Sequence, residues 1–442
     1  MKILSPTTQR DQNGGYILIT ALITCIILSY FVLIGAQALI NNAKFTRFEE
    51  KSTQALDVAD AGINYYLWHM THNQLDYKDG NTISGNGPYG PFVHNYYNVS
   101  NKLVGTYTLT ITPPVSGSTI ATVQSVGKVN GSPDSRTIIA TVGQPSFADY
   151  IFLSNDSMIF SPTSTTTGPV HSNGCIEFDG TNNGPVTSAV SSCGNGHGGV
   201  WGDGGPSSQW SYPVPAIDFS SVTADLNDLQ TLSNNGGVNL GSSGGIGWSL
   251  VLKTNGTIDL YKVTNESSSG ITRTFVRNQA APGNGILFSS EEVWVSGTGY
   301  SSRITIVAAK LPDSSSTRRS INIIDNLTTA MHDGSDSIGL IAQQDVFVPR
   351  YVPNTMEVDA AVLAQFGSVG YDTNNGPLKS SFTLLGSIAQ NQNEYAFKTT
   401  GCGSYCRGFP TTEYDFDTSL INAPPPGWPT LGSYSIMSWR EK

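Results

Sequence analysis

Two histidines and two cysteines in the middle of the chain could either bind a metal ion or contribute a disulfide. His171 lies four positions before Cys175, and Cys193 lies four positions before His197. Two thiolates with two imidazoles form the ligand set of many tetrahedral zinc sites. The alternatives are a Cys175–Cys193 disulfide, which an oxidising compartment favours, or neither arrangement. The sequence favours the disulfide, and no bound metal or other cofactor is predicted.

The remaining cysteines have different surroundings. Cys402 and Cys406 enclose Gly403 and are a second candidate disulfide, since local cysteine pairs in an exported chain are typical of disulfides. Two cysteines cannot complete a structural zinc site by themselves. Cys25 lies within an apolar run, where we expect a lipid-facing or packed thiol.

Acidic residues near one arginine are the other candidate chemical group. Asp325, Asp333 and Asp336 lie within a dozen residues of one another, and Arg350 follows. Enzymes that cleave polysaccharides need carboxylates gathered on one face. No defined spacing supports such a set here, and no G-x-S-x-G, H-E-x-x-H or phosphate-binding P-loop motif is present in the sequence. The chain is therefore predicted not to be an enzyme.

The composition favours an exported β protein. The chain has 442 residues, of which 13% are charged and 47 are glycine, whereas about 25% of residues are charged in typical soluble domains. This length suggests two or three domains. The net charge is −10, and no basic stripe with interleaved aromatic residues occurs, so a nucleic-acid partner is not expected.

The first 75 residues predict a membrane helix that continues into a soluble domain. Residues 16–43 include no charged residue, and about 20 apolar residues span a bilayer as a helix. The leader 1–15 carries Lys2 and Arg10, which predicts a cytoplasmic leader and an exported C-terminal part. Apolar residues recur at spacings of three and four up to Met70, so one helix is expected over 16–75, roughly 90 Å long. Cleavage of a signal peptide after the apolar run is the alternative.

This N-terminus resembles that of type IV prepilins and pseudopilins. A short basic leader ends in Gly14-Gly15 and is followed directly by the apolar helix. The resemblance implies cleavage between Gly15 and Tyr16 by a prepilin peptidase, followed by methylation of Tyr16. It also implies that other pilins are partners through the helix, and that the protein starts in the inner, cytoplasmic membrane and moves to a pilus on the cell surface. Glycine would permit an extended, accessible backbone at the cleaved bond.

One position departs from the pattern of major pilins. The fifth residue after the cleavage point is normally glutamate in that family, and here it is Thr20. The stretch ALDVADAGINYYLW (55–68) resembles PilX-like minor pilins, and several C-terminal stretches resemble large surface proteins of the same type. The resemblance implies a minor subunit, located at the filament tip, that primes assembly or presents an adhesive surface to a glycan or protein.

The soluble part divides into a small and a large β region. Alternating apolar residues predict strands over 104–111, 119–129 and 135–142, after a connector over 79–101, so a pilin-like head is expected over 76–145. Beyond 146, short apolar runs recur between polar turns, and GPVHSNG is nearly repeated as NNGPVTS. This pattern predicts a β-solenoid or, failing that, a β-sandwich over 146–442.

An insertion is expected over 216–290 of this large domain. It would contain an amphipathic helix over 220–232 that ends at Asn235-Gly236, and a hairpin over 248–263 whose Asn255-Gly256 predicts a type I′ turn. The C-terminal tail, rich in Pro, Trp and Tyr, is expected to wrap the body.

The predicted fold class is therefore α+β: a long N-terminal transmembrane helix, a small antiparallel sheet, and a large all-β domain. Two other hypotheses stay open. The first is a membrane-anchored protein whose solenoid binds or cleaves carbohydrate, and the second is a plain single-pass membrane protein in which Gly14-Gly15 is incidental.

Overall fold

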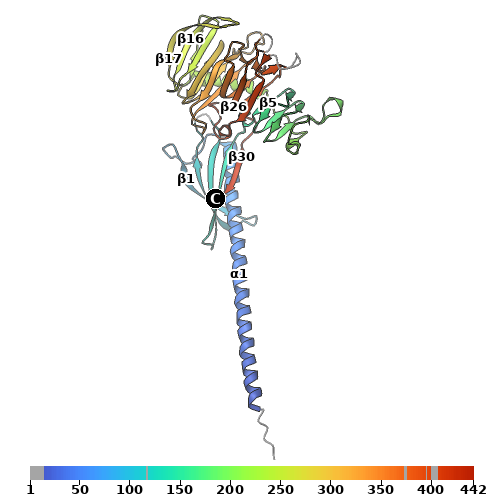
Figure 1. Ribbon diagram of the computed structural model, residues 1–442. Coiled ribbons are helices and arrows are strands. Elements are labelled where there is room, and N and C mark those ends of the chain that lie inside the picture. The colour runs from blue at the N-terminus through green and yellow to red at the C-terminus, as the bar shows by residue number, and fades with distance from the viewer. Residues whose placement is uncertain (1–13, 116–117, 373–375, 395, 400–406) are drawn as a thin grey trace, which may run out of the picture.

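A long helix, a small sheet and a large body of strands follow one another in space (Figure 1). The computed structural model describes residues 14–115, 118–372, 376–394, 396–399 and 407–442. Helix α1 (Gly14–His72) runs from a free N-terminal part into the small sheet, and the body of strands lies beyond that sheet. One long apolar helix and a β-rich region confirm the coarse α+β class.

Helix α1 has two parts that differ in what they contact. No proline occurs along its 59 residues, so the helix continues without a break. Residues 16–50 are exposed, and from Ala55 onwards one side of the helix is buried against the small sheet. The helix ends at His72, three residues before the predicted end, where the Asn73 amide donates to the His69 carbonyl.

The small sheet, which we call the head, has five antiparallel strands in the order β1-β2-β3-β4-β30. Three of them overlap the predicted strands. The other two correct the sequence analysis: β1 lies inside the predicted connector 79–101, and β30 comes from the C-terminal tail. Both are edge strands, and an edge position tolerates the Pro91 of β1 because its missing amide need not pair. The head strands are β1 (Tyr89–Tyr97), β2 (Leu103–Thr112), β3 (Ala121–Val129), β4 (Ser135–Gly143) and β30 (Ser435–Glu441).

The helix packs on the head through small residues. Strands β2 and β3 alternate buried and half-buried residues, as expected where one face of a sheet meets a helix. Ala55 and Ala59 are fully buried. A Cβ atom built on Gly127 would lie less than 3.0 Å from the Ala55 carbonyl and from the Ala59 amide nitrogen. Backbone therefore meets backbone at this point.

The large body is built mainly from parallel ladders, in which a strand pairs with a strand of another segment of the chain, and we call each such segment a coil. One ladder runs β14-β18-β20-β22-β24-β26-β5-β8-β11-β13, and a second runs β15-β19-β21-β23-β25. The near-repeat noted in the sequence stacks in register, because Val170 pairs with Val186 and Ser172 with Ser188. A sandwich of two antiparallel sheets does not have this pairing.

The strands of the first coils and of the long ladder are β5 (Phe152–Ser154), β6 (Met158–Phe160), β7 (Thr165–Thr166), β8 (Val170–Ser172), β9 (Ile176–Phe178), β10 (Thr181–Asn182), β11 (Val186–Ser188), β12 (Val200–Trp201), β13 (Trp210–Ser211), β14 (Val238–Leu240), β18 (Ile286–Ser289), β20 (Arg303–Ala308), β22 (Ser337–Ala342), β24 (Thr355–Ala364) and β26 (Ser381–Gln390). The others are β15 (Gly247–Leu252), β16 (Ile258–Ser267), β17 (Gly270–Gln279), β19 (Glu292–Tyr300), β21 (Ile321–Thr329), β23 (Val346–Val348), β25 (Val369–Tyr371), β27 (Lys398–Thr399), β28 (Arg407–Gly408) and β29 (Thr411–Phe416). The shorter helical turns are η1 (Phe147–Asp149), η2 (Gly194–Gly196), η3 (Ser207–Gln209) and η4 (Thr418–Ile421).

The chain enters this body in the middle and not at an end. From β5 it winds outwards to β13, then crosses to the opposite end at β14 and winds back to β26. There β26 pairs with β5 through Ile388 and Phe152, and β29 pairs with β7. Two stretches far apart in the sequence thus form one continuous stack, with a junction that no local pattern could have revealed.

The predicted insertion is largely part of the stack. Helix α2 (Ser221–Asn234) agrees closely with the helix predicted over 220–232, but β14 and β15 both pair in parallel with later strands. What departs from the stack is the hairpin β16–β17. The β15–β16 turn is also not of type I′. Gly256 has a φ of 75°, but Asn255 is not among the residues with positive φ, and the Gly256 amide donates to the Lys253 carbonyl. A three-residue loop with glycine in the left-handed region replaces the predicted two-residue turn.

Two chain segments connect the body to the head, and together we call them the neck: residues 144–150 and 422–434. The Phe147 amide donates to the Pro429 carbonyl, and the Leu431 amide donates to the Pro145 carbonyl, at 3.2 and 2.6 Å. The tail also packs on the body, where Trp428 is 4% exposed. The tail thus wraps the body as predicted and, in addition, returns to the head as β30 (Figure 1).

Candidate functional site

The exposed part of α1 is the largest apolar surface of the described chain. Its tyrosine, phenylalanine, leucine and isoleucine side chains from Tyr16 to Ile40 are all about half exposed or more. By length and composition α1 is the one helix in the described residues that could cross a membrane. Apolar patches on soluble monomers are normally far smaller, so this surface needs lipid or another apolar partner.

The predicted processing position lies at the start of this helix. Gly14 and Gly15 belong to the first turn of α1, so the backbone at the Gly15–Tyr16 bond is helical in this structure. The first turn of any helix lacks part of its hydrogen bonds, which lets helix ends fray. The leader before Gly14 lies outside the described residues. The Thr20 hydroxyl donates to the Tyr16 carbonyl at 3.0 Å, so this polar group is satisfied within the helix.

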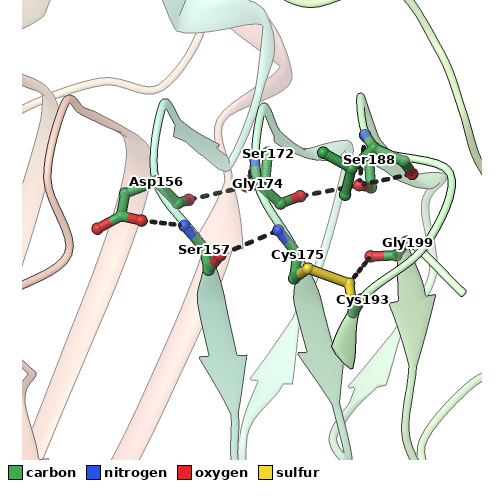
Figure 2. Close-up of a disulfide and its surroundings, with 9 residues drawn as sticks. Asp156, Ser157, Ser172, Gly174, Cys175, Ser188, Cys193 and Gly199 are labelled. Carbon is green, nitrogen blue, oxygen red and sulfur yellow. Dashed lines mark hydrogen bonds between the residues drawn. A yellow bond between two sulfur atoms is a disulfide. The ribbon is translucent and has the colours of Figure 1, made fainter. Parts of the chain in front are cut away.

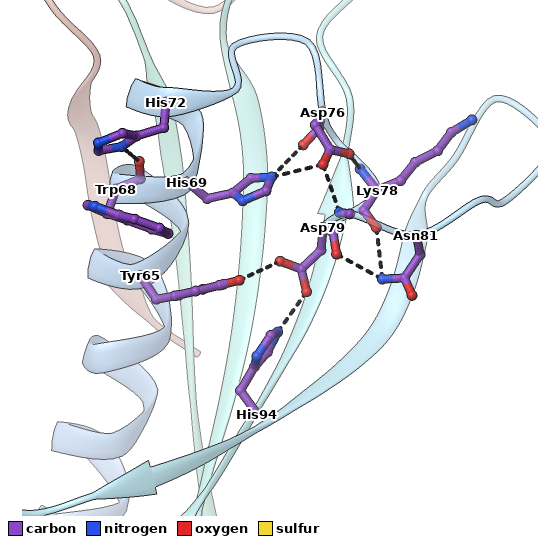
Figure 3. A network of polar contacts seen from close by, with 10 residues as sticks. Tyr65, Trp68, His69, His72, Asp76, Lys78, Asp79, Asn81 and His94 are labelled. Atoms are coloured by element: carbon purple, nitrogen blue, oxygen red, sulfur yellow. Dashed lines mark hydrogen bonds and ion pairs between the residues drawn. The ribbon is translucent and has the colours of Figure 1, made fainter.

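A polar network fastens the end of α1 to the loop that follows it (Figure 3). The Tyr65 hydroxyl donates to one carboxylate oxygen of Asp79 at 2.9 Å, and His94 Nε2 lies 2.6 Å from the other oxygen. His69 Nε2 lies 3.2 Å from the Asp76 carboxylate. Burial, together with the nearby Asp79, raises the pKa of Tyr65, so its hydroxyl stays protonated. The network holds the C-terminal end of α1 against the following loop and against β1, which carries His94.

The proposed zinc ligands are not brought together. Cys175 and Cys193 form a disulfide with Cα atoms 6.0 Å apart, so their sulfur atoms are not thiolates (Figure 2). His171 is buried, and its ring contacts Thr187 and Asn173 at 3.0 and 3.1 Å. His197 stacks on Trp201 with ring centroids 4.1 Å apart. In the described residues no three His, Cys, Asp or Glu side chains form a metal-binding group. Cys402 and Cys406 lie outside the described residues.

The disulfide sits beside a row of buried serines that repeats from coil to coil. Ser154, Ser172 and Ser188 occupy equivalent positions and are fully buried. The Ser172 hydroxyl donates to the Asp156 carbonyl, and the Ser188 hydroxyl donates to the Gly174 carbonyl, both at 2.8 Å (Figure 2). Ser172 and Ser188 thus tie their coils to the turn of the preceding one, whereas Ser154 accepts from the Asp156 amide of its own turn.

The acidic residues weighed as a catalytic set are each engaged locally. The Ser335 hydroxyl and the Ser335 amide both donate to the Asp333 carboxylate, at 2.5 and 2.9 Å, which lowers the pKa of Asp333. Asp336 accepts from the Met331 amide, and burial raises its pKa. Asp325 is exposed on β21, and Arg350 pairs with another acid, Asp372.

A groove of about 570 Å³ lies between the tip of the β16–β17 hairpin and the strand ends of the second ladder. One carboxylate oxygen of Glu266 accepts from the Tyr351 hydroxyl at 2.7 Å and from the Trp294 indole at 3.2 Å. Arg350 Nη2 lies 2.8 Å from an Asp372 oxygen. Burial and Glu266 raise the pKa of Tyr351, so its hydroxyl remains a donor. Of these residues, only Arg350 was a candidate from the sequence, because the others come from separate segments that no local motif connects.

No protein-family model matches this chain, and no curated protein matches it in sequence. Among solved structures, a match is the crystal structure of the competence-associated pilin ComZ from Thermus thermophilus, with 13% identity over 89% of this chain and 97% of that chain. The TM-score is 0.33. A TM-score of this size does not establish a shared fold.

Proposed function

We propose that this protein is a minor, pilin-like structural subunit of a type IV pilus or a related filament. The observation that carries the proposal is the form of α1: an exposed, uncharged half that continues without a break into a half packed on a small antiparallel sheet. The uncharged half fits a membrane anchor that later packs against the helices of other subunits. The large body is then held outside the cell.

The length of the free helix supports this role. Residues 16–50 would extend roughly 50 Å at 1.5 Å per residue, whereas the hydrocarbon core of a bilayer is about 30 Å thick. The helix is thus longer than an anchor alone requires. A filament in which neighbouring helices pack side by side would cover the whole exposed surface.

The finer parts of the proposal concern processing, position and shape. We propose cleavage between Gly15 and Tyr16 with methylation of Tyr16, and a place at the filament tip because Thr20 supplies no carboxylate for a neighbouring N-terminus. We further propose that the body is a β-solenoid, which its consecutive parallel pairings support. The two chain segments of the neck would keep this body in a fixed direction relative to the filament axis.

The first test is the mass of the N-terminal peptide from membranes and from sheared filaments. We expect a chain that starts at methylated Tyr16 in cells with a functional prepilin peptidase, and the intact leader in cells without one. Gly15→Leu should block cleavage, and Gly14→Ala serves as the matched control. A chain that starts at Met1 in the presence of the peptidase, or one cut beyond Ala36, would refute the proposal.

Position and activity need separate measurements. Quantitative mass spectrometry of sheared filaments should find far fewer copies of this chain than of the major subunit, and an equal number would refute the tip position. We also propose that the chain has no enzymatic activity, since Asp333 and Asp336 accept from backbone amides of nearby residues and Arg350 is paired with Asp372. Release of shorter products from any polysaccharide by the purified full chain would contradict this.

A further inference from the structure

We propose that the free edge of β17 binds an extended, acidic segment of a partner protein, which adds to the body as one more strand. The site lies in the body, so it does not depend on the role of α1 or on filament assembly. Figure 1 shows the β16–β17 hairpin on the side of the body away from α1, where neither the head nor the helix covers it.

Strand β17 has a neighbouring strand on one side only. Its ten residues pair antiparallel with β16, and no other strand of the described residues pairs with it. Strand β18, which follows in the chain, already has β14 and β20 on its two edges. The outward amides and carbonyls of β17 are thus left to solvent, and an added peptide strand can pair with them.

Strand β17 lacks two of the features that commonly protect a strand edge. Natural edge strands are often very short or carry proline, as in β12 and β13, with two residues each, and in β1, which contains Pro91. In β17 there is no proline, and its register contains no extra residue from Gly270 to Phe275. Val276 has no opposite residue on β16, which marks a bulge. At roughly 3.4 Å per residue, the regular stretch spans about 20 Å, the length of an ordinary strand.

The strand is exposed on both faces and is nevertheless held in place. Residues Thr272–Asn278 are all exposed, and Phe275 offers an apolar side chain that is 54% exposed. The hairpin is fastened to the stack near its tip, where Glu266 accepts from the Tyr351 hydroxyl and the Trp294 indole. A partner strand therefore meets an ordered edge, and little free energy is lost in ordering it.

The charge of β17 selects an acidic partner. The strand carries Arg273 and Arg277 and no acidic residue, in a chain whose net charge is −10. Arg273 donates to the Ser249 hydroxyl at 2.6 Å and lies over the Tyr261 ring. Arg277 donates to the Gln279 side chain at 3.3 Å. All these partners are neutral, and neither arginine belongs to an ion pair of the described residues. Carboxylates on an opposite strand would be attracted to both.

Other occupants fit this edge less well. Two copies of β17 would bring two arginines each and no acidic residue, and like charges across a strand pair are destabilising. A polyanion without peptide amides, such as a sulfated polysaccharide or a nucleic acid, would use the charge but could not continue the hydrogen-bond pattern of the sheet. The observations favour an acidic peptide in an extended conformation.

The test measures binding of a fluorescein-labelled decapeptide of five Glu-Val repeats to the full chain. The chain is kept in lauryldimethylamine oxide at low salt, and fluorescence anisotropy is the readout. We expect a Kd of about 500 μM or lower. A peptide with lysine in place of glutamate should bind at least tenfold more weakly. The same is expected with D-glutamate, which keeps the charge but prevents a regular strand because its handedness alternates with that of valine.

Two further measurements place the peptide on β17. Arg277→Glu should weaken binding about tenfold, whereas Lys262→Glu, the same charge change on the inner strand β16, should weaken it less than threefold. In hydrogen–deuterium exchange, the bound peptide should slow the amides of residues 270–277 at least fivefold and leave β20 unchanged. Dextran sulfate, the polyanion control, should not slow them.

Several results would overturn the proposal. These are a Kd above about 500 μM, equally tight binding of the lysine or D-glutamate peptide, equal protection by dextran sulfate, or an Arg277→Glu effect no larger than that of Lys262→Glu. Amides of β17 that stay unprotected with the peptide would do the same, as would protection that rises with the concentration of the chain alone, since a second copy would then occupy the edge. None of these results affects the N-terminal mass measurement, so this proposal and the proposed function can fail separately.

Discussion

Replacing Gly127 by alanine should weaken the packing of α1 on the head. The added Cβ would lie less than 3.0 Å from the Ala55 carbonyl oxygen and from the backbone of Ala59, so no flexible side chain can move aside. Overpacking a well-packed core costs about 1–3 kcal/mol, and we expect the upper half of that range because backbone must shift. This corresponds to roughly 30- to 150-fold more frequent opening of the contact.

The assay is hydrogen–deuterium exchange of the full chain in detergent, followed by mass spectrometry. Amides of β3 should exchange roughly 30- to 150-fold faster in the Gly127→Ala variant, while amides of β20 in the body should keep their rates. Gly241→Ala is the control, because a Cβ there meets no heavy atom within 4 Å. A change of less than about threefold in β3, or an equal change in the control variant, would refute the close approach of helix and sheet.

Three further outcomes are expected. Arg303→Met removes a guanidinium that donates to the Pro424 carbonyl at 2.6 Å. The contact between the tail and the body should therefore weaken by about 1–3 kcal/mol. Limited proteolysis within 417–434 should become faster, and unchanged cleavage would contradict this. Burial raises the pKa of Asp149 to about 6, above its value in the unfolded chain, so stability should fall as pH rises from about 4 to 6. Asp149→Asn should reduce that fall by up to about 3 kcal/mol in urea unfolding, and an identical pH profile would argue against a buried carboxyl. Replacing Cys175 and Cys193, 18 positions apart, by serine should cost the surrounding coils about 3 kcal/mol, measured by local hydrogen exchange, with the head unchanged as the internal control.

Elements with a strong local pattern were largely predictable. The uncharged run and the spacing of three and four determine α1, because helical hydrogen bonds and a buried stripe depend on near neighbours. The same holds for β2 and β4, whose buried residues alternate along the strand. The near-repeat around Val170 and Val186 predicted two similar short strands, and these two strands pair in parallel.

The candidate sites were less predictable. Sequence spacing identified Cys175 and Cys193 as partners because both residues belong to one short segment of consecutive coils. The groove was missed, since Glu266, Asn322 and Phe347 are brought together by a folded-over hairpin and by the order of the ladder. Outward-facing side chains on separate strands carry no common local signal.

The sequence by itself determined that a long apolar helix precedes a β-rich body, and it contained the turns and alternations that define most short strands. Tertiary structure decided which strands meet. Strand β30 joins β4 across about three hundred residues, and β26 meets β5 where two distant stretches of coils join. A strand edge offers the same row of amides and carbonyls to any partner, so pairing depends on which edge the rest of the fold leaves open. That choice is made by the packing of the whole chain, and it cannot be read from either strand alone.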